Sequence, residues 1–366
     1  MSTASSIPVP AASLAALVGR IFAASGVPDK SAKAVAEALV EADLEGIASH
    51  GVMLVDMYVD RLRQGSVSPD AQCVVVSDRD STVVLDAANT LGQVSADQAT
   101  EFAIARARRF GAGVVAVRHA FHFGAARRYA VAAANAGCVG IAMCNTRPLM
   151  PAPGGAERVV GNNPIAVAVP TEGPIPLVLD MATSEAAMGK IRMAQKAGNA
   201  IPATWAVRED GTPTTDPAEA IAGMLLPSAG PKGFGLALMI DLMCGLLSGG
   251  AIGDEVRPLY GSLSTPYDCS HLFIAIDVAH FGDVAAFRAR AAAAAERIRA
   301  GRRAPGVSQL FTPGEPEWRR RERSAGTVEL QPAVAAMLTK LAGELGVSPS
   351  PLAGSTQPEG TDHAKA

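Results

Sequence analysis

Five short motifs decide how this chain is interpreted. In order, they are Ser49-His50-Gly51, His122-Phe123-Gly124, Gly161-Asn162-Asn163-Pro164, Asp180-Met181-Ala182 and Pro231-Lys232-Gly233-Phe234-Gly235. Two of them place a histidine beside a glycine, and the last places a lysine at a predicted helix start. One tripeptide is weak evidence of function, whereas the order, spacing and joint presence of all five are specific.

The usual phosphate-binding fingerprints are absent from this sequence. The stretch Gly111-Ala112-Gly113 with Ala116 formally matches the G-x-G-x-x-A pattern. That fingerprint needs a strand before it and a helix after it, whereas here a helix precedes and a strand follows. Gly111 is therefore interpreted as a helix stop. Gly189-Lys190 lacks the upstream glycine of a P-loop, so phosphates must be bound in another way.

Composition indicates a globular protein with a large aliphatic core. Of the 366 residues, 49% are hydrophobic and 18% charged, which excludes global disorder. Aromatic residues make up only 4%, so Ala, Val, Leu and Ile must form most of the core. The net charge of -3 provides no basic field, and we expect no nucleic-acid partner.

Cysteine usage and hydropathy favour a cytoplasmic protein that does not enter a membrane. The five cysteines form no Cys-x-x-Cys pair, and reduced thiols fit them best. The N-terminus lacks a basic segment followed by a long apolar core, so no signal peptide is expected. The apolar stretch 236–247 carries Asp241, which suits a buried helix better than a membrane span.

Alternating helix and strand signals predict an α/β fold with a helical subdomain. We expect helices at 10–24, 29–45 (with Asp29 as N-cap), 49–64, 95–109, 124–135, 232–247 and 283–299. We expect strands at 73–76, 82–85, 113–117, 139–144, 165–169, 177–179 and 271–276. The predicted domains are a helical subdomain (1–70, joined by the C-terminal helices of 282–345), an α/β cofactor-binding core (71–281) and a disordered tail (346–366).

His122 is the first candidate for acid–base chemistry. It follows the expected strand 113–117 and precedes a helix, and such loops are common ligand sites in α/β proteins. Reduction of a carbonyl by hydride leaves an alkoxide that needs a proton, which a histidine can supply near neutral pH. Taken alone, a histidine that caps the helix or is satisfied within the loop is the simpler interpretation.

His50 is the second candidate, at the start of the expected helix 49–64. The positive end of the helix dipole disfavours a charged imidazole there, so a neutral His50 would polarise a substrate carbonyl. The alternative is that Ser49 caps the helix and His50 is merely exposed. Tyr58, two turns further on, would line the substrate pocket or, alternatively, belong to the core.

Lys232 is the candidate for phosphate binding. Free amides, the helix dipole and the ammonium group would together favour a pyrophosphate, although a solvated lysine in a turn is the alternative. Asp180-Met181-Ala182 ends one expected strand and Thr146 follows another, so both are expected to line the same crevice.

A metal site is not expected. His119 and His122 have the i, i+3 spacing of paired ligands, but no carboxylate or cysteine close by in the sequence completes a zinc set. His271 lies in an apolar expected strand, where a structural role is the simpler interpretation.

Together the motifs resemble the malate/L-lactate dehydrogenase family, whose nicotinamide-binding fold is not a Rossmann fold. The resemblance extends from about residue 49 to about residue 323, and segments 201–207, 213–217 and 229–233 bring it closest to the ureidoglycolate dehydrogenase branch. It implies NAD or NADP as cofactor, a homodimer, proton transfer by His122 and substrate contact by His50. The positions at which it implies cofactor contacts are Thr146, Asp180, Met181, Ala182, Lys232, Gly314 and Glu315.

Two positions depart from the family pattern. The arginine that the family usually has four residues after the Ser-His-Gly histidine is Leu54 here, which cannot bind a carboxylate. The aspartate that the ureidoglycolate branch has after the position of Thr146 is Arg147. We expect Arg147 to bind the substrate carboxylate, with a surface-loop role as the alternative, and Ser49 and Tyr58 to be further substrate contacts.

These observations predict an NAD(P)-dependent oxidoreductase that acts on a small 2-hydroxy acid or its 2-oxo counterpart. An alternative of the same class is a cyclic imine-2-carboxylate reductase. Alternatives of other classes are a metal-dependent hydrolase using His119 and His122, and a binding protein that lost activity with the arginine at position 54.

Overall fold

The computed structural model describes residues 6–352, and the chain forms two compact units. Unit 1 contains Met1–Arg63 and Arg319–Ala366, and unit 2 contains Gln64–Trp318. Unit 1 is thus discontinuous, and its second segment starts later than sequence reasoning placed it. Residues 282–318 belong to unit 2, because the helix at 284–299 follows the last strand of the unit 2 sheet after one short turn.

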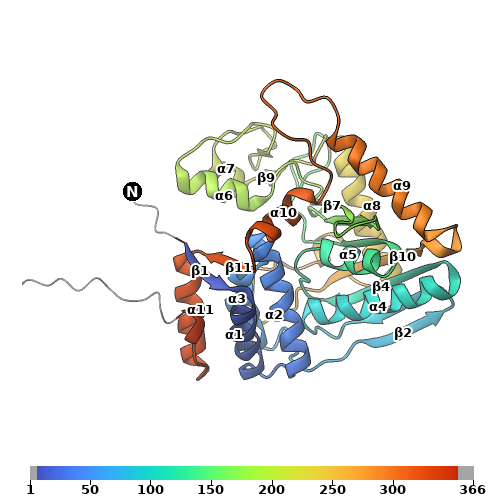
Figure 1. Cartoon of the computed structure of the whole chain (residues 1–366). Helices are drawn as coiled ribbons and strands as arrows, with labels where there is room; N and C mark the ends of the chain where they lie inside the picture. Colours follow the sequence, from blue (N-terminus) through green and yellow to red (C-terminus); the bar gives the residue numbers. More distant parts are fainter. Residues whose placement is uncertain (1–5, 353–366) are drawn as a thin grey trace, which may run out of the picture. The chain divides into compact units, whose positions relative to one another are not determined.

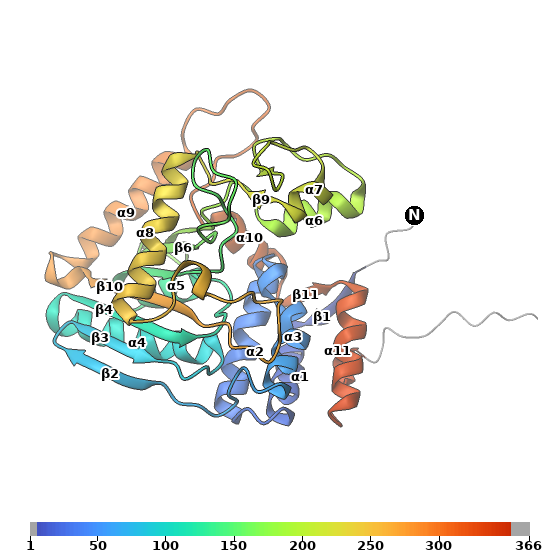
Figure 2. The ribbon, with the colours of Figure 1, turned by 180° about the vertical axis from the view of Figure 1, so that it is seen from behind.

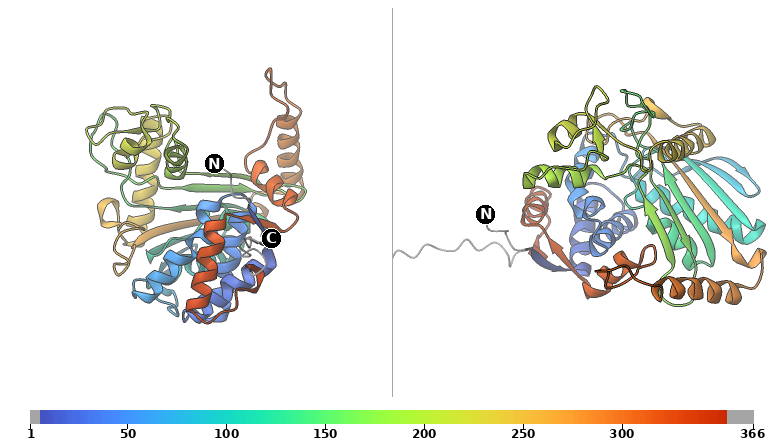
Figure 3. Two further views of the ribbon diagram at one scale, coloured as in Figure 1. Left: turned by 90° about the vertical axis from the view of Figure 1, so that its left-hand side faces the viewer. Right: turned by 90° about the horizontal axis from the view of Figure 1, so that it is seen from above.

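Unit 1 joins a helical bundle to a two-stranded antiparallel sheet. Its elements are β1 (Ile7–Pro10), α1 (Ala11–Ala24), α2 (Asp29–Leu44), η1 (Ala48–His50), η2 (Val52–Leu54), α3 (Val55–Arg63), β11 (Thr327–Leu330), α11 (Pro332–Glu344) and η5 (Ser350–Leu352). Strand β1 pairs with β11, and α11 packs against α1 and α3 (Figure 3). The end of the chain therefore completes the core of the N-terminal helices.

The expected helix 49–64 is broken, and this is the largest local error of the sequence prediction. Gly51 is extended (φ -93°, ψ -158°) and separates η1 from η2, so α3 begins only at residue 55. The cause is Asp43 in α2, whose carboxylate accepts the Val52 N–H at 2.8 Å. A smaller correction concerns α2, whose N-cap is Pro28, with Asp29 in the first turn.

Unit 2 is built on a seven-stranded sheet in the order β2-β3-β4-β10-β5-β6-β7. Its strands are β2 (Val74–Arg79), β3 (Thr82–Asp86), β4 (Ala112–Ala120), β5 (Cys138–Cys144), β6 (Ile165–Val169), β7 (Leu177–Met181) and β10 (Cys269–Asp277). The β3–β4 pair is parallel and the other neighbouring pairs are antiparallel. Strand β10, which comes late in the sequence, is thus the central strand and lies between β4 and β5.

Helices cover both faces of this sheet. Helices α4 (Gly92–Phe110) and α5 (Arg127–Asn135) pack on one face and α8 (Pro231–Ser248) on the other, as Figures 1 and 2 show. The approach of α4 to β4 is so close that a Cβ on Gly113 would lie 2.1 Å from the Ala103 carbonyl oxygen. Gly111 ends α4 in the left-handed conformation (φ 88°), the helix stop that its sequence context predicts.

The remaining elements of unit 2 are short or lie in its periphery. They are α6 (Met188–Ala197), β8 (Ala206–Val207), α7 (Pro217–Ala222), β9 (Met224–Leu225), η3 (Gly253–Glu255), η4 (Val278–His280), α9 (Val284–Arg299) and α10 (Glu315–Arg323), which crosses into unit 1. Of these, α9 was expected from the sequence, and α10 is among the C-terminal helices expected within 282–345. The expected disordered tail is described up to residue 352, where it contains η5, and its remainder lies outside the described residues.

Helix α8 is, within residues 6–352, the one helix long and apolar enough to cross a membrane. Its Asp241 is buried and accepts a hydrogen bond from Asn145 (2.9 Å), and its inner face packs on β4, β5 and β10. These contacts give α8 the place of a core helix that covers one face of the sheet.

Candidate active site

The His122 loop connects β4 to α5 and is fixed by the aromatic residues on either side of the histidine. Phe121 and Phe123 are each 1% exposed, whereas His122 is half-buried. The Phe123 ring lies 5.1 Å from that of Tyr129, whose hydroxyl donates to the Phe123 carbonyl at 2.6 Å. The imidazole of His271 packs on the other side, with ring centroids 4.5 Å apart. His122 is therefore held by a loop with little freedom to move.

The first turn of α4 adjoins the same loop. A Cβ on Gly92 would lie 2.2 Å from the Phe121 carbonyl oxygen and 2.4 Å from that of His122. Any larger residue would have to displace the backbone that carries the histidine.

His271 has the structural role expected for it. It is fully buried, and burial lowers its pKa to about 3, so the ring is neutral at physiological pH. Its Nε2 lies 3.3 Å from the Cys269 sulfur.

His119 is paired with a carboxylate. Its Nδ1 lies 2.9 Å from Asp86 Oδ2, which also accepts from the Arg118 Nε at 3.1 Å. Over the described range 6–352, no group of three His, Cys, Asp or Glu side chains is arranged to hold a metal ion.

His50 is the last residue of η1 in unit 1, so it does not occupy the first turn of an α-helix. Burial lowers the pKa of His50, so desolvation, and not a helix dipole, favours its neutral form. The Ser49 hydroxyl lies 2.9 Å from Nδ1, and no capping bond of Ser49 is found at this helix. When that hydroxyl donates to a neutral ring, the proton resides on Nε2, which is then a donor.

One prediction about the neighbourhood of His50 is wrong. Tyr58, expected in the substrate pocket, is fully buried in the core of unit 1, 6.4 Å from the Phe22 ring. Leu54 lies in η2, separated from His50 by the extended Gly51, and it is only 2% exposed. The position at which the family has its arginine is therefore a core position in this chain.

Asp43 is a residue of this region that the sequence did not single out. Besides accepting the Val52 N–H, its carboxylate covers Gly51, where a Cβ would lie 2.1 Å from Oδ1. Burial raises the pKa of this carboxyl to about 7. The backbone that follows His50 is thus held by a group that titrates near neutral pH.

On unit 2, Thr146 is bound to the Gly-Asn-Asn-Pro motif. Its N–H donates to Asn163 Oδ1 (2.8 Å) and its hydroxyl to Asn162 Oδ1 (3.0 Å). Gly161 permits this packing, since a Cβ there would lie 2.2 Å from the Thr146 hydroxyl. The motif thus fixes the end of β5.

Asp180, Met181 and Ala182 lie at the end of the edge strand β7, and the backbone connects them to the start of α8. Thr183 N–H donates to the Asn162 carbonyl (3.0 Å), and Ser228 N–H donates to the Thr183 carbonyl (2.9 Å). Lys232, exposed in the first turn of α8, follows shortly after Ser228. These bonds join the backbone segments that carry the expected cofactor residues.

Arg127, which the sequence also did not single out, lies at the start of α5 and is 4% exposed. Its N–H lies 3.4 Å from Asp180 Oδ2, and its guanidinium lies 3.8 Å from Glu317 Oε2. Surrounding protein raises the pKa of the Asp180 carboxyl to about 6, although Arg127 acts against that shift.

Gly314 and Glu315 dock on β7 in different ways. A Cβ on Gly314 would lie 2.8 Å from that of Val178, and Val178 N–H donates to the Pro313 carbonyl. Glu315 is 1% exposed, and its Oε2 accepts from Arg299 Nε (3.0 Å) and from the N–H and hydroxyl of Thr312. The Glu315 carboxylate thus connects the start of α10 to Arg299 and Thr312.

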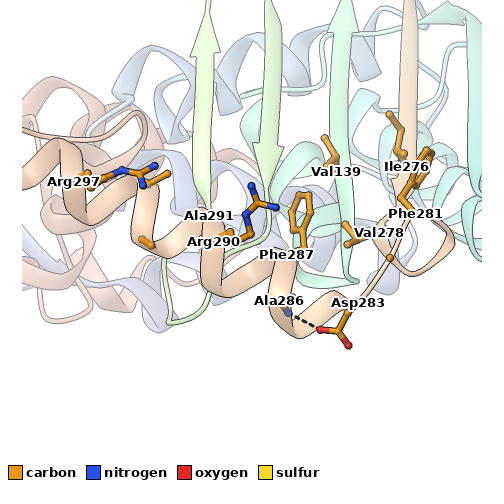
Figure 4. Close-up of a pocket in the computed structure, with 13 residues that line it drawn as sticks. Val139, Ile276, Val278, Phe281, Asp283, Ala286, Phe287, Arg290, Ala291 and Arg297 are labelled. Carbon is orange, nitrogen blue, oxygen red and sulfur yellow. Dashed lines mark hydrogen bonds between the residues drawn. The ribbon is translucent and has the colours of Figure 1, made fainter.

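An apolar groove in unit 2 is separate from these residues. It lies between α9 and the ends of β5 and β10 (Figure 4). Its lining residues include Val139, Ile276, Phe281, Phe287 and Arg290. No expected catalytic or cofactor residue lines it.

The full set of motifs matches a family model. The model, described as malate/L-lactate dehydrogenase, matches residues 9–339. The chain belongs to this family. The assignment made from the motifs is thereby confirmed, together with the fold class that it implies.

Individual relatives cover most of the chain. Malate dehydrogenase from Pyrococcus abyssi is 38% identical over 315 residues, which cover 84% of this chain and 86% of that protein. Ureidoglycolate dehydrogenase (NAD(+)) from Escherichia coli is 38% identical over 291 residues, with coverage of 80% and 83%. The solved structure of sulfolactate dehydrogenase from Methanocaldococcus jannaschii matches with a TM-score of 0.89 at 34% identity, covering 94% of this chain and 99% of that one.

The raised pKa of Asp43 predicts a pH-dependent stability. Folding raises the pKa of this carboxyl from 3.8 to about 7, so its stabilising contribution is complete below pH 4 and is lost as the pH rises through 7. Asp43→Asn keeps an oxygen that can accept the Val52 N–H but does not titrate. Between pH 5 and pH 8, we expect the melting temperature of the variant to fall less than that of the wild type. The corresponding difference in the free energy of unfolding is at most about 1.4 kcal/mol per pH unit.

The matched control is Asp29→Asn, which removes an exposed carboxyl of the same helix. Melting curves at several pH values, followed by circular dichroism, make the comparison. Identical pH slopes for the wild type and Asp43→Asn would contradict this interpretation of Asp43.

Proposed function

We propose that His122 is the proton-transferring residue of an oxidoreductase that interconverts a small 2-hydroxy acid and its 2-oxo counterpart. Membership of the malate/L-lactate dehydrogenase family carries the reaction class, which is CH–OH oxidoreduction with NAD or NADP. The observation that supports His122 is its place in a loop held on both sides by buried aromatic residues and by the first turn of α4. Such fixation is what a general acid–base group requires.

The residues of unit 2 fit a nicotinamide cofactor. An exposed lysine and free N–H groups at the start of an 18-residue helix suit a pyrophosphate, and Gly230 (φ 61°) turns the chain into that helix. We propose that Lys232, Thr146 and the segment 180–182 hold the cofactor. When bound, the cofactor supplies or accepts the hydride at C2 of the substrate.

The protein's own part of the reaction is proton transfer and substrate orientation. His122 would take the proton from the substrate hydroxyl during oxidation and return it to the oxygen during reduction. His50, whose pKa is lowered by burial, is the second candidate for a donor to that oxygen, through Nε2 when the Ser49 hydroxyl donates to Nδ1. Arg147 would bind the carboxylate, for which its planar guanidinium is suited.

We also propose that the protein is a cytoplasmic homodimer. The outward face of α8 carries five exposed apolar side chains at helical spacing, which are Leu236, Met239, Met243, Leu246 and Leu247. An apolar helix face of this extent is typical of a protein interface, and a second copy of the chain would cover it. Five free cysteines support a reducing compartment.

For the catalytic role, we expect His122→Ala to lower kcat by about 100-fold or more, the usual size of a general acid–base contribution. Cofactor affinity and melting temperature should change little. The assay is reduction of a panel of 2-oxo acids and cyclic imine-2-carboxylates with NADH and NADPH, with His50→Ala measured in parallel.

The panel also separates the alternative functions. A preference for cyclic imines would identify an imine reductase, and cofactor binding without turnover would indicate an inactive binding protein. Loss of activity with chelator, restored by zinc, would favour a metal-dependent mechanism. Near-normal turnover by His122→Ala would transfer the proton-transfer role to His50.

For cofactor binding, we expect Lys232→Ala to weaken NAD(P)H binding by roughly 10- to 150-fold, the value of one charge-assisted contact. Calorimetric titration with both cofactors measures the effect. Lys340→Ala, which removes an exposed lysine of α11, is the control and should leave the affinity unchanged. An unaltered affinity in Lys232→Ala would exclude this lysine from the site.

For assembly, we expect sedimentation to give a dimer for the wild type and a monomer for Leu246→Asp, because an unpaired charge in an apolar interface is costly. Phe281→Asp is the control, since Phe281 is 77% exposed and lies between η4 and α9, outside α8. A monomeric wild type would contradict the proposed assembly.

A further inference from the structure

Asp43 holds the segment that carries His50 at two points. The residue lies in the last turn of α2, and its Oδ2 accepts the Val52 N–H at 2.8 Å. Its backbone carbonyl accepts the Gly46 N–H at 2.9 Å. The same residue therefore ends the helix and closes a loop with the chain nine residues further on, and His50 lies within that loop.

The interior of this loop is fixed by short-range backbone hydrogen bonds. His50 N–H donates to the Ile47 carbonyl at 2.8 Å, and Gly51 N–H donates to the Ala48 carbonyl at 3.0 Å. These bonds set the shape of η1. The two hydrogen bonds accepted by Asp43 set how this turn is attached to the end of α2.

Gly51 leaves room for the Asp43 carboxylate. The backbone of Gly51 has a negative φ (-93°) that other residues also adopt, so backbone strain does not account for a glycine here. Space does account for it, because a Cβ at this position would lie 2.1 Å from Oδ1 and 2.4 Å from Oδ2 of Asp43. The carboxylate thus lies directly against the residue that follows His50.

The end of α2 is itself anchored within unit 1. Arg321, on the C-terminal part of α10, places its Nη1 2.6 Å from Glu41 Oε1 and 3.8 Å from Glu45 Oε1. Both glutamates lie within two residues of Asp43, and Glu45 is only 8% exposed. The helix end from which the Asp43 side chain reaches the His50 segment is therefore held by charge pairs that are partly shielded from water.

We propose that Asp43 is a positioning residue for the reaction, because through Gly51 and Val52 it sets where the His50 imidazole meets the substrate. This inference rests on the proposed function, in which His50 is a donor to the substrate oxygen. The Ser49 hydroxyl, 2.9 Å from Nδ1, orients the ring, and Asp43 orients the backbone that carries both residues. Placement of such a donor matters, since an error of about 1 Å costs up to roughly 100-fold in rate.

The first test removes the contact from the side of α2. Asp43→Ala lacks the acceptor for the Val52 N–H, whereas Asp43→Asn keeps an oxygen in its place. On the best substrate of the panel, we expect Asp43→Ala to lower kcat by roughly 10- to 100-fold, with NAD(P)H affinity unchanged. Asp43→Asn should recover most of that loss. Asp29→Ala, which removes an exposed carboxyl of the same helix, is the control and should behave as the wild type.

The second test disturbs the same contact from the other side. The methyl group of Gly51→Ala would displace the Asp43 carboxylate, so we expect the same fall in kcat as for Asp43→Ala. The double variant should lose no more than either single variant, because removal of the carboxylate leaves room for the methyl group. Gly343→Ala, which adds a methyl group in open space on α11, is the control.

The His50→Ala background separates positioning from a general loss of stability. If Asp43 acts through His50, then Asp43→Ala causes no further loss of kcat in an enzyme that already lacks the imidazole. Equal losses with and without His50 would overturn the proposal, and so would full activity of Asp43→Ala. Wild-type turnover by His50→Ala would remove His50 from the reaction, and the role of Asp43 with it, while the hydride-transfer function would stand.

Nuclear magnetic resonance provides a readout that needs no substrate. The imidazole C–H signals of His50, assigned by their loss in His50→Ala, report its pKa, which burial lowers in the wild type. Asp43→Ala and Asp43→Asn both remove the charge, so a higher His50 pKa in the alanine variant isolates the lost contact. Equal values in the two variants would overturn the proposal. A higher value in an enzyme that reduces no panel substrate would retain the positioning role and remove the proposed reaction.

Discussion

Two buried asparagines hold together the part of unit 2 that carries Thr146 and Lys232. Asn163 accepts the Thr146 N–H and donates to the Ala237 carbonyl of α8, while Asn145 donates to Asp241 and accepts the Ser270 N–H. Both are fully buried, and each of these bonds replaces hydration that burial removed. Because the bonds connect β5, β10 and α8, the position of Thr146 relative to Lys232 depends on them. An apolar core alone would leave that relation poorly specified, since hydrophobic contacts have little directionality.

Local patterns predicted those parts of the fold that local forces determine. The strand expected at 165–169 has the predicted bounds, and the helix stop at Gly111 follows from chemistry within a few residues. The break in the helix expected at 49–64 was invisible because its cause, Asp43, lies in the preceding helix and acts through a tertiary hydrogen bond. The burial of Tyr58 and Leu54 followed from that break, since it changes which face of the segment looks inward.

The candidate site was predictable to the extent that its residues lie in motifs. His122, Thr146 and Lys232 could be found because glycines and strand ends surround them in the sequence. Arg127 carried no such signal, because an arginine on an amphipathic helix is usually solvated and nothing in the sequence places it near a site. Glu315 differs from Arg127 because its position could be matched to the family from the sequence. Its carboxylate, however, accepts hydrogen bonds from Arg299 and Thr312.

The central position of β10 has a consequence for how the chain acquires its structure. Strands β4 and β5 pair with β10 and not with each other, and β10 spans residues 269–277. During synthesis the middle of the sheet therefore cannot close until roughly three-quarters of the chain has emerged from the ribosome, and β1 must wait longer still for β11. Until then, two apolar strand edges have no partner, and the many distant contacts make folding slow. We therefore expect the incomplete chain to expose the unpaired edges of β4 and β5 for longer than a sheet built from strands in sequence order would.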